Sequence, residues 1–448
     1  MIVPTRRLLF WVGAVVLPFS ALAGTVPSAL FLSVGLMVAL FLLALTDALF
    51  ALGRLYGVDI EFPQVVRLSK GRDGAIELRI QNEGIRVRRL RLGLAFPDGL
   101  YSPYQDLVTE LPKETPSSSL SWPLKALRQG RYLLENCYLE ALSPLGFWAG
   151  RAVRSAASEI RVYPNLLKER KDLAALFLNR TTLGIHTQRQ IGRGRDFEHL
   201  RDYIPSDSFD DIHWKATAKW GRPITKVFQI EGAQELYLII DASRLSGRST
   251  FEPGYGVPVP TTVLERFITA SLILGLAAER QGDLFGILTF SDRVRGFVRA
   301  RNGKAHYNAC RDTLYTLKSQ GVSPDFSELF TFITTRIRRR ALLIFLTNLD
   351  DPILAEGFVQ KINLISRRHL VLVNVLTPQG ARPLFSSSHV NSVHDLYRHL
   401  GGHFLWSSLR DTEKILKRRG VGFSLLDNEN MCAQLVSQYL TIKQRQIL

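Results

Sequence analysis

The chain has 448 residues, of which 46% are hydrophobic, and it carries a formal net charge of +17 at pH 7. This length predicts about three domains, with enough apolar residues for real cores. The three cysteines (Cys137, Cys310 and Cys432) are far apart and in no metal-ligand spacing, which excludes a disulfide framework and fits a reducing compartment. The positive charge favours a surface that faces anionic lipid headgroups, with an acidic protein partner as the alternative. Nucleic-acid binding is not favoured, because no element carries a repeating stripe of basic and aromatic residues.

Two apolar segments open the chain. Residues 8–26 carry no charge, and residues 29–52 carry only Asp47, near their end. Each segment is long enough to cross about 30 Å of hydrocarbon as a helix. A two-residue turn separates them, so residues 1–57 are predicted to form a transmembrane helical hairpin. For Asp47 we expect a place near the interface and a snorkelling or helix-pairing role.

Basic residues flank the outer ends of this hairpin, with Arg6 and Arg7 before it and Arg54 after it, and the turn between the helices has no charge. Positive residues stay on the cytoplasmic side, so we expect an inner (plasma) membrane protein with cytoplasmic soluble domains. An alternative is that residues 1–23 are a cleaved signal peptide, because residues 21–23 (Ala-Leu-Ala) resemble a cleavage site.

Residues 58–164 have a period of two. Segments such as 75–81 (AIELRIQ) and 132–140 (YLLENCYLE) alternate apolar and polar residues, and turn signals such as Asp73-Gly74 separate most of them. Several short strands at roughly ten-residue spacing predict a small all-β sandwich. The segment 143–148 (SPLGFW) is expected to be a turn with an aromatic plug.

Residues 165–233 are a linker that runs into a highly charged segment, and residues 234–448 alternate between strands and helices. Strands are expected at residues 236–241, 284–290, 341–348, 370–376 and 422–427, and two of the helices at residues 392–400 and 409–419. Strands this apolar are buried on both faces, which predicts an α/β, Rossmann-like domain with a mainly parallel sheet and helices on each side.

The charged segment has the pattern R-x-Y-x-x-x-D followed by W-K-x-x-A. The matching residues are Arg201, Tyr203, Asp207, Trp214, Lys215 and Ala218. Placed just before a buried strand that ends on Asp241, this pattern resembles the bacterial family catalogued as domain of unknown function 58, and the flanking segments also fit that family. The resemblance implies two N-terminal transmembrane helices and a von Willebrand factor A-like domain. It also implies a MoxR-type AAA+ ATPase as partner, in assembly or chaperone-like maturation.

The chain departs from the family pattern at two places in this segment. Ser206 stands where Gly is usual, and Asp210 stands where Arg is usual, which reverses a charge. The first five matching residues, Arg201, Tyr203, Asp207, Trp214 and Lys215, are called the collar below. One interpretation makes the collar a recognition surface, and the other makes it an internal ion-pair network that packs Tyr203 and Trp214 onto the sheet. The second is preferred for the two aromatic residues, and both stay open for the charges.

The resemblance also implies a place for a metal ion. In von Willebrand factor A domains a D-x-S-x-S turn, with a Thr and an Asp from two other loops, supplies the oxygen ligands that Mg²⁺ requires. This chain keeps Asp241 and Ser243, but Leu245 replaces the second Ser and Asn348 replaces the Asp. The substitutes within reach of the pattern are Ser323, Asp325 and Asp350. No cofactor is therefore expected, and the edge formed by Asp241, Ser243 and Asn348 is predicted to bind a partner without a metal. The alternative is a Mg²⁺ ion held by the remaining candidates Asp241, Ser243, Ser323 and Asp350.

Enzyme motifs are missing from the sequence. It contains no GxxxxGK[ST], HExxH or GxSxG motif. His306 and Cys310 are four residues apart on a predicted helix, but no third, orienting carboxylate is evident and a free Cys usually fills a core. The sequence therefore predicts a membrane-anchored cytoplasmic adaptor. The alternatives are a cryptic hydrolase at the Asp241 edge and a charge-driven binder of lipid or nucleic acid.

Overall fold

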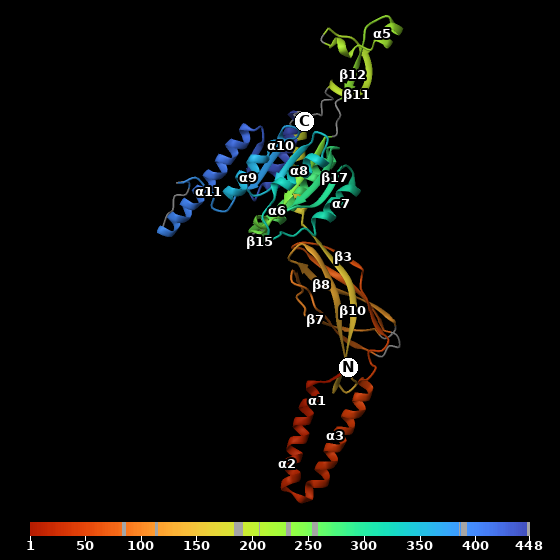
Figure 1. Cartoon of the computed structure of the whole chain (residues 1–448). Coiled ribbons are helices and arrows are strands. Elements are labelled where there is room, and N and C mark those ends of the chain that lie inside the picture. The colour runs from red at the N-terminus through yellow and green to blue at the C-terminus, as the bar shows by residue number, and fades with distance from the viewer. Residues whose placement is uncertain are drawn as a thin grey trace. The chain divides into compact units, whose positions relative to one another are not determined.

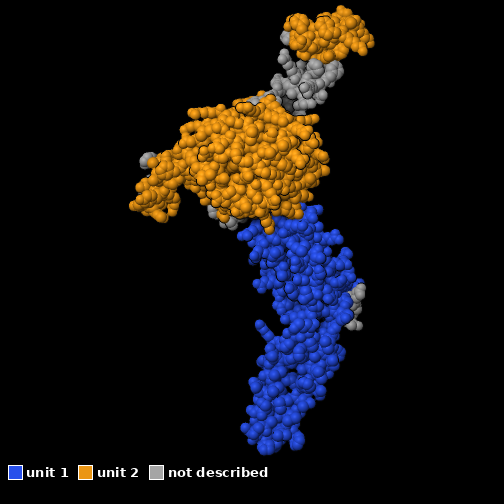
Figure 2. Space-filling model, in the orientation of Figure 1, with its two compact units in different colours: residues 1–165 blue, residues 166–448 orange. Residues whose placement is uncertain are grey.

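The computed structural model of the chain describes all residues except 83–86, 113–114, 183–190, 206, 230–233, 253–258, 385, 387–391 and 446–448. Ser206, one of the two departures from the family pattern, therefore lies outside the described residues. The chain forms two compact units, residues 1–165 and residues 166–448 (Figure 2). Each unit has apolar cores of its own.

Unit 1 begins with a hairpin of two apolar helical arms (Figure 1). The first arm comprises α1 (Arg6–Trp11), a π-helical turn (Val12–Val16) and α2 (Leu17–Thr25), and the second comprises a 3-10 turn (Pro27–Ala29) and α3 (Leu30–Ala51). By length and composition both arms can cross a membrane. Apolar side chains are exposed around both arms, as is typical of helices that face lipid. The prediction of two long apolar helices is confirmed.

The strands of unit 1 form two sheets that contribute to one apolar core. The larger sheet has the order β1–β10–β9–β5–β7, with β3 beside β10, and the smaller has the order β2–β4–β8–β6. Alternate residues of β4, such as Ile76 and Leu78, point into the core, where Leu92 and Leu139 of the other sheet meet them. The strands are β1 (Ile2–Pro4), β2 (Val58–Glu61), β3 (Val65–Ser69), β4 (Asp73–Asn82), β5 (Arg89–Leu94), β6 (Leu100–Tyr101), β7 (Asp106–Glu110), β8 (Ser117–Ala126), β9 (Gly130–Leu142) and β10 (Trp148–Tyr163).

The hairpin and the β region are joined by buried polar contacts. β1 precedes the first arm and pairs antiparallel with β10. Asp47, near the end of α3, is only 1% exposed. Its carboxylate accepts hydrogen bonds from Ser143 Oγ at 2.6 Å and from the backbone N–H groups of Leu145 and Phe147, both at 3.0 Å. Asp47 therefore binds the turn at residues 143–147, and the expectation of a snorkelling or helix-pairing side chain is wrong.

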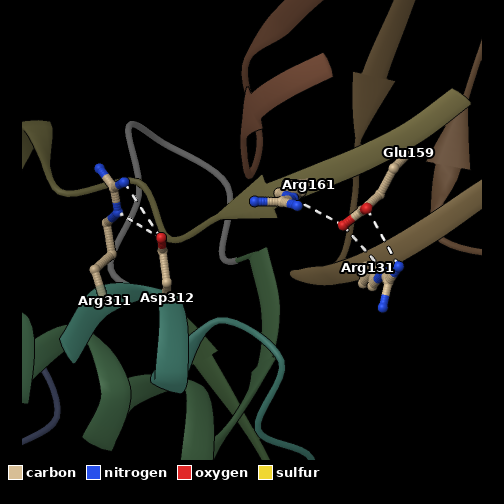
Figure 3. Close-up of polar contacts among 5 residues, drawn as sticks. All are labelled: Arg131, Glu159, Arg161, Arg311 and Asp312. Atoms are coloured by element: carbon tan, nitrogen blue, oxygen red, sulfur yellow. Dashed lines mark hydrogen bonds and ion pairs between the residues drawn. The ribbon is translucent and has the colours of Figure 1, made fainter. Parts of the chain in front are cut away.

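A charged cluster lies on β9 and β10, two inner strands of the larger sheet of unit 1. The Glu159 carboxylate lies between Arg161, 2.7 Å away, and Arg131, 3.0 Å away (Figure 3). The hydrogen bond from Arg161 is the largest of the interactions that lower the pKa of Glu159, and Arg131 adds to it. These residues belong to β9 and β10, which form the longest antiparallel pair of the sheet.

Unit 2 is built on a six-stranded sheet with the order β17–β16–β13–β18–β19–β20. Every neighbouring pair from β16 to β20 is parallel, and β17 joins the edge antiparallel to β16. β13, which ends on Asp241, therefore lies inside the sheet between β16 and β18. The strands are β13 (Glu235–Asp241), β16 (Leu284–Phe290), β17 (Val294–Arg301), β18 (Leu342–Leu346), β19 (Leu370–Leu376) and β20 (Gly422–Leu426).

Helices cover both faces of this sheet, because successive residues of each buried strand point to opposite sides. Leu238 and Ile240 of β13 join a core with α6 and α12, whereas Tyr237 and Ile239 join a second core with α8, α9 and α11. The helices are α4 (Leu167–Thr182), α6 (Val263–Arg280), α7 (Lys304–Leu314), α8 (Phe326–Arg336), α9 (Pro352–Lys361), α10 (Asn363–Ser366), α11 (Val393–Arg418) and α12 (Met431–Arg445). A small hairpin, β14 (Ser249–Glu252) and β15 (Val259–Thr262), precedes α6.

One helix differs from its sequence prediction. Two helices were expected, over residues 392–400 and 409–419, but α11 is continuous from Val393 to Arg418. The continuous helix includes two glycines, Gly401 and Gly402. A Cβ on Gly402 would lie 2.0 Å from the carbonyl oxygen of Gly380, so glycine is needed there for close packing inside the helix.

Candidate functional site

At the edge of the sheet where β13 ends, the Asp241 carboxylate accepts hydrogen bonds from neighbouring residues of the chain. Asp241 is fully buried. One carboxylate oxygen accepts from the backbone N–H of Ser243 at 2.8 Å, and the other accepts from Thr347 Oγ1 at 2.7 Å. Burial raises the pKa of Asp241 above its usual value, and the hydrogen bonds from Thr347 and Ser243 oppose that change. This side chain is a buried anchor between β13 and the end of β18.

Three further side-chain contacts join the loop after β13 to the loop after β18. Asn348 Nδ2 donates to Ser246 Oγ at 3.3 Å, and Arg244 pairs with Asp351 at 3.4 Å. Arg248 forms an ion pair with Asp350, whose side chain is almost fully buried. Both arginine side chains are about half exposed. The two loops are thus joined by direct side-chain contacts.

These residues do not fit a divalent cation. Among the described residues, no group of three His, Cys, Asp or Glu side chains is arranged to hold a metal. Asp325 is occupied as the N-cap of α8, where it accepts from Ser327 N at 2.8 Å, and Ser323 is exposed. Asp350, the remaining substitute, has Arg248 as its positive partner. Ser243 Oγ and one Asp350 oxygen are buried without a partner among the described residues, but the nearby guanidinium would repel a cation.

The collar lies on a separate β-hairpin of unit 2, formed by β11 (Ile191–Asp202) and β12 (Ile224–Gln229). Arg201 Nη2 is 2.6 Å from one oxygen of Asp207, and the other oxygen accepts from Ile204 N at 3.1 Å. The Tyr203 ring lies 5.9 Å from that of Phe209. Arg201 and Asp207 therefore stabilise the turn after β11 and are not a free charged surface.

Between the two strands lies α5 (Trp214–Trp220), a helix of seven residues with a defined start and end. His213 Nδ1 accepts from Ala216 N at 3.0 Å at the start, and Gly221 adopts a left-handed conformation, with φ 68°, at the end. Trp214 is 68% exposed, so the interpretation that it packs onto the sheet is wrong. Lys215 is exposed beside it.

Sequence reasoning missed part of this exposed surface. Trp220 and Phe209 are also exposed. Arg222 lies over the Trp220 ring, 5.8 Å from its centroid, and pairs with Asp202 at 3.1 Å. The length of the helix could have indicated this exposure. A helix of seven residues that ends before Gly221 has only about two turns, too few to bury both Trp214 and Trp220 at its ends.

His306 and Cys310 have a structural role. His306 Nε2 lies 2.6 Å from the carbonyl oxygen of Phe285 and 3.5 Å from Cys310 Sγ. Burial raises the pKa of Cys310 to about 12, so its thiolate is scarce at neutral pH. This agrees with a cysteine that fills the core.

The part of the chain that contains the collar and the Asp241 edge is similar to a known protein family. Residues 199–383 match the family described as "Protein of unknown function DUF58". No curated protein matches the chain at a significant level.

Several solved structures are similar to parts of the chain. An aerotolerance-related membrane protein from Bacteroides fragilis NCTC 9343 is 15% identical, with a TM-score of 0.29, over 47% of this chain and 99% of that one. The VWA domain of SpRpn10 is 8% identical, with a TM-score of 0.28, over 46% of this chain and 95% of that one. An uncharacterised membrane-spanning protein from Vibrio fischeri is 16% identical, with a TM-score of 0.18, over 48% of this chain and 100% of that one. The region that is similar to the DUF58 family, residues 199–383, covers the collar and the α/β unit from β13 to β19.

Proposed function

We propose that the chain is an inner-membrane adaptor that presents a protein-binding surface to the cytoplasm and works with a MoxR-type AAA+ ATPase in assembly or chaperone-like maturation. In this proposal the hairpin anchors a β-sandwich and a von Willebrand factor A-like domain. The observation that supports it best is the exposed face of α5, which carries Trp214 and Lys215 of the collar.

The physical argument concerns the composition of that face. Trp214 and Ala218 are four residues apart and so lie on one side of α5, with Lys215 and Lys219 beside them. All four are exposed. Tryptophan is enriched among the residues that dominate protein–protein binding energy, and flanking positive charges speed association with an acidic partner. The sheet edge contributes less, because Asp241 is buried and its loops are already joined.

Capture by a purified MoxR-type ATPase of the same organism tests the proposal, with the full-length chain in detergent. Trp214→Ala and Lys215→Glu should each weaken binding at least tenfold, and both should leave the melting temperature unchanged. Lys318→Glu is the matched control, because this lysine is also exposed and lies outside the collar. Wild-type affinity in both collar variants would refute the role of α5.

A charge-driven lipid binder is the second candidate, because tryptophan and lysine also suit the headgroup region of an anionic membrane. Flotation of the full-length chain cannot separate it from anchoring by the hairpin. Two measurements on ATPase capture can separate the two candidates. One is the salt dependence of capture, and the other is whether the ATPase is still captured when anionic lipid micelles are added as competitor. The hydrolase alternative has no comparable support, since both oxygens of the buried Asp241 accept hydrogen bonds.

The proposed orientation has its own test. A reporter fused after the last residue should report a cytoplasmic location, because basic residues flank both outer ends of the hairpin. The same preparation should retain residues 1–23 by intact mass, since β1 forms part of the β region. A periplasmic signal would overturn both the location and the partner.

A further inference from the structure

Among the described residues, helix α11 is supported along one side. Its second half packs into the unit 2 core through Leu409 and Leu416. Its first half is held by the loop before it, where Gly402 lies against Gly380 and His403 Nδ1 accepts from Leu384 N at 3.1 Å. Figure 1 shows α11 as the long blue helix at one side of this unit. The first half of α11 is therefore a supported helix.

The opposite side of this first half is apolar and exposed. The exposed fractions are 70% for Val393, 50% for Leu396, 67% for Tyr397, 36% for Leu400 and 65% for Phe404. The spacing of three, four, seven and eleven residues puts all five on one helical face. At about 100° per residue this face is roughly opposite Gly402. An apolar stripe of this kind normally packs against another surface, and its exposure marks an interaction site.

The charges near the stripe argue against an anionic occupant. Within residues 393–408 the formally charged side chains at pH 7 are Asp395 and Arg398, which pair with each other at 3.4 Å. A helix that lies on a membrane normally has a polar face rich in Lys and Arg, and nucleic acid also requires positive charge. A neutral apolar stripe instead fits a second neutral apolar helix.

We infer that this face of α11 pairs with the same face of a second copy of the chain, with the two helices antiparallel. The stripe is nearly symmetric along its length. Antiparallel pairing about its midpoint brings Val393 level with Phe404 of the second copy, and Tyr397 level with Leu400. A small side chain thus meets a large one near each end, as close packing requires.

The area buried between the two helices determines whether the pair can form in dilute solution or only in a membrane. If each of the five side chains buries on the order of 100 Å², two copies bury roughly 1,000 Å² in total. That is the lower limit for a specific interface, so the pair is weak in dilute solution. Two copies anchored in one membrane have a high effective concentration, and the pair therefore forms there.

Disulfide trapping in intact membranes tests the inference with the full-length chain. Leu400→Cys should give a covalent dimer on mild oxidation, because two copies of residue 400 lie close to the two-fold axis. The wild type should give none, since Cys137, Cys310 and Cys432 are buried. Lys414→Cys should also give none, because antiparallel copies of this exposed residue are roughly 45 Å apart along the helix axes.

Two further variants separate a specific pair from random collision. Tyr397→Glu, added to Leu400→Cys, should reduce the dimer at least tenfold because it places a charge in the stripe. His394→Glu, on the same exposed half of α11 but outside the stripe, should not. The inference is overturned if Leu400→Cys gives no dimer or links to a different protein, if Lys414→Cys links equally well, or if Tyr397→Glu has no effect.

Discussion

Asp47 provides the sharpest test of how the hairpin is joined to the β region. Its buried carboxylate accepts one hydrogen bond from a hydroxyl and two from backbone N–H groups of the turn at residues 143–147. Replacing it by alanine leaves those three donors without an acceptor, one of them buried and two partly buried. Each such loss costs about 1–3 kcal/mol, and partial relaxation of the turn brings the expected total to about 3–5 kcal/mol.

Two milder changes should give a graded response. Asp47→Asn keeps one oxygen acceptor and should cost about 1–2 kcal/mol. Ser143→Ala removes one of the three bonds, together with the bond that Ser143 Oγ accepts from Trp148 N at 3.1 Å, and should also cost about 1–2 kcal/mol. Thr46→Ala is the matched control, because this exposed neighbour bonds only to the carbonyl of Leu43 within its own helix.

Thermal unfolding of the full-length chain in detergent, followed by tryptophan fluorescence, measures these costs. For a unit of this size 1 kcal/mol corresponds to about 2–4 °C, so Asp47→Ala should lower the melting temperature of unit 1 by about 10 °C. Asp47→Asn and Ser143→Ala should fall between that value and the control. If Asp47→Ala melts within about 2 °C of Thr46→Ala, the carboxylate does not stabilise the junction and the argument fails.

Three other predictions follow from side chains in unit 2. Millimolar Mg²⁺ should leave the melting temperature unchanged, since a ligand at a hundred times its dissociation constant would add about 2.7 kcal/mol; a rise that Asp241→Asn abolishes would reveal a metal site. Asp207→Ala removes the carboxylate that pairs with Arg201, so it should lower the free energy of unfolding by about 2 kcal/mol and with it the melting temperature. Lys215→Glu should leave the melting temperature unchanged. Equal melting temperatures of the two variants would contradict the roles assigned to these residues. Burial lowers the pKa of His369 from 6.5 to about 4, so the unfolded chain binds a proton at a higher pH than the folded chain does. The free energy of unfolding should therefore fall by about 2 kcal/mol as the pH drops from about 6.5 towards 4. Denaturant titration measures this loss, which should be absent in His369→Leu.

The buried strands of unit 2 were predictable because each is an apolar run between turn signals. The expected segments 284–290 and 370–376 coincide with β16 and β19, and 236–241 differs from β13 by one residue. β17 was missed, since its alternating VRGFVRAR pattern belongs to a half-exposed antiparallel edge and not to a strand buried on both faces. β1 was missed because three residues before an apolar helix have no detectable period.

The contacts at the candidate site were less predictable than the strands. Sequence places Asp241 at the carboxyl edge of the sheet, but one of the two donors to its carboxylate, Thr347 Oγ1, lies 106 residues away in the sequence. Which hydroxyl reaches Asp241, and whether Arg248 reaches Asp350, depends on strand order and on side-chain rotamers that no local pattern encodes. The prediction for Trp214 was wrong for a related reason. A family pattern shows which residues recur, but it does not show whether their side chains point into the core.

The carboxylates in this chain show why polar motifs alone are a poor guide to its activity. Asp47, Asp207 and Asp241 are the acidic residues that sequence reasoning selected first, and each has its oxygens engaged by donors within the chain. A buried carboxylate that already accepts two or three hydrogen bonds has little capacity left for a ligand. The groups that remain available are the apolar and aromatic side chains of α5 and α11, which no neighbouring element covers among the described residues. Exposed tryptophan, tyrosine and phenylalanine side chains are typical of surfaces that bind other proteins, and their exposure on α5 and α11 supports the proposed adaptor role.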